Sequence, residues 1–90
     1  MTQNKVLIVD DDSHITELIK LYVEKEGFEG IVAHNGRLAL DAFKSYSPAI
    51  VILDVMMPEM DGWQVCREIR KFSNVPIIML TAKGDTFDKV

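Results

Sequence analysis

Short runs of consecutive apolar residues recur along this chain, separated by segments with helical spacing. The runs occupy positions 5–9, 49–53 and 75–80, and a weaker one at 28–33 is interrupted by Gly30. Apolar runs of this length without polar alternation are typical of strands in a parallel sheet, which helices cover on both faces. The pattern therefore predicts four strands.

The segments between these runs carry apolar residues three and four positions apart, which predicts three helices. The first helix follows Ser13 and ends near Gly27, a residue suited to a left-handed C-cap. Its apolar positions are Ile15, Leu18, Ile19 and Tyr22. The second helix follows the Asn35-Gly36 turn and passes through Ala39, Ala42 and Phe43. The third begins at Asp61 as its N-cap, with Val65, Cys66, Ile69 and Phe72 on one face.

Strands and helices alternate strictly, in the order β-α-β-α-β-α-β. Such an order predicts an α/β fold whose parallel sheet is built with right-handed crossovers. Ligands of these sheets bind beyond the carboxyl ends of the strands. Asp10, Asp54 and Thr81 each stand at the end of a predicted strand, so this edge is the expected functional site.

Three aspartates are expected to lie close together at that edge, where a bound cation would offset their mutual repulsion. If the first and third strands are neighbours, Asp10, Asp11 and Asp54 share one crevice. Two like charges about 5 Å apart repel by about 3 kcal/mol at an effective dielectric near 20, so the crevice opposes folding unless it binds a cation. Magnesium prefers oxygen ligands and is often held by carboxylates together with a phosphate. We expect Asp54 to act as a nucleophile toward phosphorus, with the Thr81 hydroxyl donating to the new oxygens.

Composition restricts the other possibilities. A chain of 90 residues is expected to form one domain, spanning residues 1–90. Its net charge of −4 argues against direct nucleic-acid binding by this segment. No apolar run approaches membrane-spanning length, no signal peptide is evident, and Cys66 is the single cysteine, so we expect a cytoplasmic protein.

Three segments together resemble the response-regulator receiver domains of bacterial two-component signalling. They are an acidic pair after the first strand, the pattern L-D-x-x-M-P-x-M-D-G from Leu53 to Gly62, and Thr81-Ala82 after the fourth strand. The resemblance spans the whole chain. It implies a three-layer, flavodoxin-like fold and a parallel sheet of order 2-1-3-4 in this chain.

The resemblance also implies roles for individual residues. Asp54 matches the phosphorylated aspartate, and Thr81 matches the switch hydroxyl. The implied direct magnesium ligands are Asp11, Asp54 and the backbone carbonyl of Met56, and Asp10 matches a ligand that acts mainly through water. Supporting positions are Pro58, Asp61, Gly62 and Ala82. The implied function is transfer of a phosphoryl group from a sensor histidine kinase to Asp54, without enzymatic turnover, which switches an output that is a DNA-binding domain in many family members.

One departure from the family pattern is clear. Receivers carry a lysine after a fifth strand, but this sequence stops at Val90, and Lys83 is not that residue. The sequence therefore resembles a receiver truncated before the fifth strand and last helix. We expect the open edge of the fourth strand to favour self-association. A competing hypothesis is a fragment that cannot be phosphorylated and acts only as an interaction module.

Other interpretations of the same residues are weaker. The three consecutive aspartates, taken alone, would suit a helix N-cap and the helix dipole, a role that we assign to Asp12 only. A haloacid-dehalogenase-type phosphatase needs a second acid two residues after its nucleophile, where this chain has Met56. His14 and His34 are predicted to be surface residues, not phosphoryl carriers or metal ligands.

Overall fold

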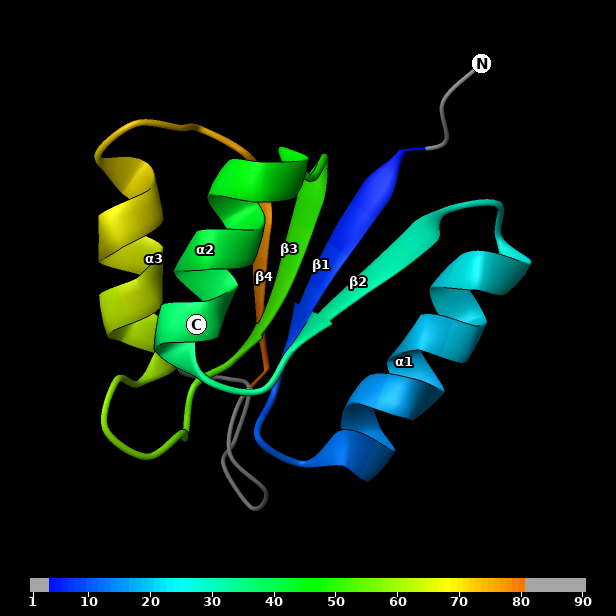
Figure 1. Cartoon of the computed structure of the whole chain (residues 1–90), viewed down its shortest axis with the longest axis horizontal. Coiled ribbons are helices and arrows are strands. Elements are labelled where there is room, and N and C mark those ends of the chain that lie inside the picture. The colour runs from blue at the N-terminus through cyan, green and yellow to red at the C-terminus, as the bar shows by residue number, and fades with distance from the viewer. Residues whose placement is uncertain (1–3, 81–90) are drawn as a thin grey trace, which may run out of the picture.

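The computed structural model describes residues 4–80, which form four strands and three helices (Figure 1). The strands are β1 Lys5–Val9, β2 Glu29–Ala33, β3 Ile50–Asp54 and β4 Ile77–Leu80. The helices are α1 Ser13–Lys25, α2 Gly36–Tyr46 and α3 Gly62–Arg70. The strands pair in parallel in the order β2-β1-β3-β4, which confirms the expected topology.

The helices form two layers, one on each side of the sheet (Figure 1). Helix α1 packs over β1 and β2, where a side chain added at Gly30 would meet Lys20, Val23 and Ile8. Helices α2 and α3 cover the opposite face. Neighbouring residues of a strand point to opposite sides of the sheet, so each strand offers side chains to the helices on both faces. The three-layer architecture predicted from the sequence is therefore confirmed.

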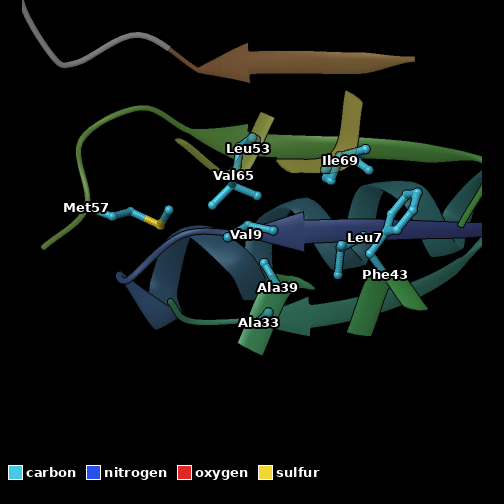
Figure 2. Close-up of a cluster of buried hydrophobic side chains, with 10 residues drawn as sticks. Leu7, Val9, Ala33, Ala39, Phe43, Leu53, Met57, Val65 and Ile69 are labelled. Carbon is cyan, nitrogen blue, oxygen red and sulfur yellow. The ribbon is translucent and has the colours of Figure 1, made fainter. Parts of the chain in front are cut away.

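The main core lies between the sheet and the α2–α3 layer (Figure 2). Leu7 and Val9 of β1 and Leu53 of β3 are fully buried there, together with Val65 and Ile69 of α3. Burial of one such side chain contributes about 1.5–3 kcal/mol. This core fixes the positions of β1 and β3, the two strands whose ends carry the aspartates.

Each helix begins at a polar N-cap. Asp12 caps α1 and accepts a hydrogen bond from the His14 N–H, and Asn35 caps α2 in the same way. Asp61 and Gln64 form a reciprocal capping box at the start of α3. The caps that we assigned to Asp12 and Asp61 are confirmed. At the other end of α1, Gly27 has a φ of +94°, as expected after a helix C-terminus.

Three of the strands begin later than the apolar runs suggest, β3 by one residue, at Ile50. The fourth run includes Pro76, whose carbonyl accepts a hydrogen bond from the Val51 N–H, but β4 starts only at Ile77. Proline has no N–H to donate, which shortens the ladder at this point. In the second run, the Phe28 N–H donates to the Val23 carbonyl at the end of α1, so β2 starts at Glu29.

Helix α1 turns an unexpected face toward the sheet. Thr16 is its one fully buried residue, whereas Leu18 and Tyr22 are 52% and 64% exposed. The apolar spacing predicted the helix, but most of the apolar residues point away from the strands that α1 covers. Among the described residues, no helix is long and apolar enough to cross a membrane.

Candidate functional site

Three carboxylates converge at the carboxyl ends of β1 and β3. Val9 pairs with Leu53 in the sheet, so Asp10 and Asp54, the next residues along, lie side by side. Ligand oxygens of Asp10, Asp11 and Asp54 all lie within 4.8 Å of one another. Asp10 is buried, Asp54 is partly buried and Asp11 is exposed. The site is therefore an acidic cluster in which exposure to solvent increases from Asp10 through Asp54 to Asp11.

The backbone holds the Asp10 carboxylate in place. Its Oδ1 accepts a hydrogen bond of 2.9 Å from the Asp12 N–H, and the Asp10 N–H donates to the Ala33 carbonyl at 3.2 Å. The second bond continues the β1–β2 ladder past the end of the strand. Asp12 thus contributes its backbone to the site and its side chain to the α1 cap.

Asp54 is fixed at the end of β3 by bonds on both sides. The Val55 N–H donates to the Leu80 carbonyl at 3.1 Å, and the Gly62 N–H donates to the Val55 carbonyl at 2.9 Å. Backbone hydrogen bonds from Met56 and Val55 also reach the Asp54 carboxylate. The nucleophile candidate is therefore held by β4 on one side and by the first residue of α3 on the other.

Burial and charge crowding raise the pKa of two of the three carboxyls. Desolvation is the main cause for Asp10, followed by the repulsion from Asp54 and Asp11, while the Asp12 N–H lowers its pKa in part. For Asp54, burial again has the largest effect, with a smaller rise from Asp11 and opposing hydrogen bonds from Met56 and Val55. Both groups therefore resist the ionised state that a cation would stabilise.

This crowding predicts how stability depends on pH when no metal is bound. Because the folded-state pKa of Asp10 and Asp54 lies above the ordinary value of 3.8, the folded state holds more protons just above that pH. Their contribution to the free energy of unfolding should therefore fall as the pH rises through this window. Asp10→Asn, which keeps the oxygen that accepts from Asp12, should raise that free energy at neutral pH by roughly 1–3 kcal/mol, the scale of one removed repulsion.

Urea unfolding monitored at several pH values checks this prediction. The control is Asp41→Asn, an exposed aspartate on α2 that lies outside the cluster. Millimolar Mg²⁺ should stabilise the parent protein, by about 2.7 kcal/mol at one hundred times the dissociation constant, and should stabilise the Asp10→Asn variant less. Equal stability of parent and variant without metal, at every pH, would contradict the expected repulsion.

The loop between β3 and α3 places the remaining predicted residues that the structure describes. Met56 follows Asp54 by two positions and is 63% exposed. The Pro58 carbonyl accepts a hydrogen bond from the Met60 N–H at 2.8 Å, which tightens the turn. Asp61 caps α3, and Gly62 lies buried against the end of β3.

Two predicted site residues, Thr81 and Ala82, lie outside the described residues. They follow Leu80, whose Cα is the register partner of Asp54. A different polar residue was missed by the sequence analysis: Thr16 is fully buried, and its hydroxyl lies 3.2 Å from Nε2 of His34. The sequence signal that could have identified Thr16 is its position among the apolar residues of α1.

The donor set suits one class of metal. Three carboxylates offer only hard oxygen ligands, which is the chemistry that Mg²⁺ and Ca²⁺ select, whereas Zn²⁺ and copper sites usually contain His or Cys. Within residues 4–80, this is the one group of three or more such side chains close enough to share a metal. The residues present therefore fit Mg²⁺.

Comparison with known proteins agrees with this geometry. Residues 6–90 match the model of the response regulator receiver domain family. A protein of Guillardia theta named "Probable transcriptional regulator ycf27" is 48% identical over 89 residues, which make up 99% of this chain and 35% of that protein. The chain thus spans about a third of the length of such relatives.

Solved structures give the same result. The BeF3-activated N-terminal receiver domain of Klebsiella pneumoniae RstA superposes with a TM-score of 0.86 and 32% identity, over 96% of this chain and 73% of that one. A chain in the structure of histidine kinase ThkA in complex with response regulator protein TrrA matches with a TM-score of 0.83 and 41% identity. The match covers 93% of this chain and 73% of that one. Fold, family match and relatives agree, and this chain belongs to the response regulator receiver domain family.

Proposed function

We propose that this receiver domain, taken as one unit over residues 1–90, accepts a phosphoryl group on Asp54 with the help of Mg²⁺ held by Asp10, Asp11 and Asp54. The observation that carries the proposal is the convergence of the three carboxylates within 4.8 Å, at the strand ends of a chain from this family. The domain is a switch that becomes phosphorylated and not an enzyme with multiple turnovers.

The chemistry follows from how Asp54 is held. One carboxylate oxygen attacks the phosphorus, a new P–O bond forms, and the bond between phosphorus and the donor breaks, with its electron pair leaving on the donor. Asp10 and Asp11 hold the metal, which neutralises charge on the phosphoryl oxygens when it is bound. The hydrogen bonds from Met56 and Val55 keep the attacking carboxylate oriented. Before the metal binds, burial and the charge of Asp11 disfavour the ionised form of Asp54, which is why its pKa is raised.

The supporting residues complete the proposed site. We assign to the Met56 backbone carbonyl a place among the metal ligands, and to Thr81 the hydroxyl that donates to the phosphoryl oxygens. Ala82 leaves space for that movement. Pro58, Asp61 and Gly62 shape the loop that carries Met56, as their turn, cap and close-packed positions suggest.

The partners follow from the relatives and their printed names. TrrA is a response regulator in complex with histidine kinase ThkA, which supports a sensor histidine kinase as the phosphoryl donor here. The relative from Guillardia theta is named as a transcriptional regulator and is about three times as long as this chain. We therefore propose a DNA-binding output domain in the whole protein, which acts in the cytoplasm.

Incorporation of phosphate tests the proposed function. The protein is incubated with Mg²⁺ and a small acyl phosphate, and its intact mass is measured over time. We expect the addition of one phosphoryl group that requires Mg²⁺ and is lost when a chelator is present from the start. Equal labelling with and without the chelator would contradict the metal site. The absence of labelling in Mg²⁺ would contradict the phosphoacceptor role.

The sheet edge suggests that the 90-residue chain also associates with itself. Among the described residues, no strand pairs with the outer edge of β4, and Ile78 on this strand is 52% exposed. Unpaired edges of this kind can pair with another chain. Sedimentation of the 90-residue chain should show a dimer or larger species that Ile78→Lys dissociates. The control is Leu21→Lys, an exposed apolar position on α1, which should leave the association unchanged.

A further inference from the structure

The buried hydroxyl of Thr16 joins two segments that are distant in sequence. Thr16 is 0% exposed on α1, and its Oγ1 lies 3.0 Å from the Ser13 carbonyl and 3.2 Å from Nε2 of His34. His34 is the first residue after β2. The contact therefore links the first turn of α1 to the end of a strand.

The chemistry of this contact indicates which atom carries the hydrogen. A threonine hydroxyl has one hydrogen to donate and two lone pairs to accept with. With the Thr16 hydroxyl donating to the Ser13 carbonyl, the geometry assigns the donor role in the second contact to the ring, which is the His34 tautomer with its hydrogen on Nε2.

This bond closes a ring of interactions around a proposed metal ligand. Asp10 donates through its N–H to the Ala33 carbonyl, and the next residue, His34, donates to Thr16. The Thr16 N–H donates to the Asp12 carbonyl, and the Asp12 N–H donates back to Oδ1 of Asp10. The His34–Thr16 bond is the one link of this ring that joins two side chains.

We propose that His34 and Thr16 are positioning residues that set the orientation of the Asp10 carboxylate for cation binding. The proposal rests on the metal site of the proposed function and extends it to residues that touch neither metal nor phosphate. Without the bond, the first turn of α1 can shift relative to β2, and the Asp12 N–H that aims Oδ1 shifts with it. Loss of an outer-shell partner typically weakens metal binding about 10- to 100-fold.

Paired substitutions separate positioning from general packing. Thr16→Val removes the hydroxyl and keeps the shape, whereas Thr16→Ser keeps the hydroxyl. His34→Leu removes the ring donor, whereas His34→Gln can still present an N–H at a similar reach. Titration of Mg²⁺ by calorimetry should give a dissociation constant about tenfold higher for Thr16→Val and for His34→Leu. The serine and glutamine variants should stay close to the parent, and the Val/Leu double variant should be no weaker than either single one.

A second measurement reports the bond without any metal. Long-range ¹H–¹⁵N NMR spectra of the histidine ring should show the Nε2-protonated form of His34 in the parent, and a changed Nε2 signal in Thr16→Val. If Thr16→Ser loses as much Mg²⁺ affinity as Thr16→Val, or if His34 is protonated only on Nδ1, the positioning role is wrong.

The two proposals can fail separately. If all four variants bind Mg²⁺ as tightly as the parent while Asp54 is still phosphorylated, the positioning role is wrong and the proposed function stands. If the parent itself binds no Mg²⁺, both are wrong.

Discussion

Replacing Asp54 by asparagine should abolish phosphorylation by a small acyl phosphate in the presence of Mg²⁺. Asparagine keeps the shape of the side chain but lacks the anionic oxygen that attacks phosphorus, and it removes one of three carboxylates from the cluster. Intact-mass analysis should therefore show no phosphorylated species, at a donor concentration and time at which the parent protein is labelled. This is a complete loss and not a partial reduction.

Two controls make the result specific to an aspartyl phosphate. Asp41→Asn changes an exposed aspartate on α2, which pairs with Arg37, and should be labelled like the parent. Treatment of the labelled parent with hydroxylamine should remove the phosphate and leave an aspartyl hydroxamate, because acyl phosphates react with this nucleophile whereas a phosphoserine ester does not. Labelling that persists in Asp54→Asn would place the phosphate on another residue.

Gly62→Ala should destabilise the domain by about 3 kcal/mol, the upper range for a group forced into a filled space. A Cβ at Gly62 would overlap the backbone carbonyl oxygen of Asp54 and lie 2.9 Å from the Cα of Val55. These are backbone atoms at the end of β3, and they cannot turn aside as a side chain can. The substitution should therefore push α3 away from the strand that carries the nucleophile, and weaken Mg²⁺ binding as well.

Gly36→Ala is the matched control for this substitution. Gly36 is also buried and also begins a helix behind a polar N-cap, but the three atoms nearest to its added Cβ all belong to the Met60 side chain, with the sulfur at 2.7 Å and Cβ and Cγ at 2.8 Å. The sulfur and Cγ can turn aside, whereas the Met60 Cβ must shift together with its loop, so we expect a cost of about 1–2 kcal/mol. Urea denaturation of the two variants measures the difference. Equal losses would show that the backbone contact at Gly62 is not decisive.

Local sequence determined the elements of this fold. The apolar runs marked all four strands, since a strand covered on both faces needs apolar residues at consecutive positions. The caps at Asp12 and Asp61 were predictable because capping depends only on residues within one turn of the helix start. The positions of Asp10 and Asp54 at the carboxyl edge followed from the same runs, because parallel strands end at one edge of the sheet.

Other features depended on contacts between distant segments. Periodicity identified α1, but the sheet buried Thr16 and left Leu18 and Tyr22 largely exposed, because the side of a helix that faces the sheet is set by how the helix is docked. The sheet order came from the family resemblance, since spacing along one chain does not say which strands are neighbours.

The chemistry of the site was decided mainly by tertiary structure. Asp10 and Asp54 are far apart in sequence, and only the pairing of β1 with β3 brings their carboxylates within 4.8 Å and raises the pKa of each. The bond between Thr16 and His34 has the same origin, because it requires α1 to lie across the end of β2. The sequence by itself determined which residues stand at the ends of strands. Only the folded chain determined the distances between them, because charge repulsion and hydrogen bonding depend on separation in space.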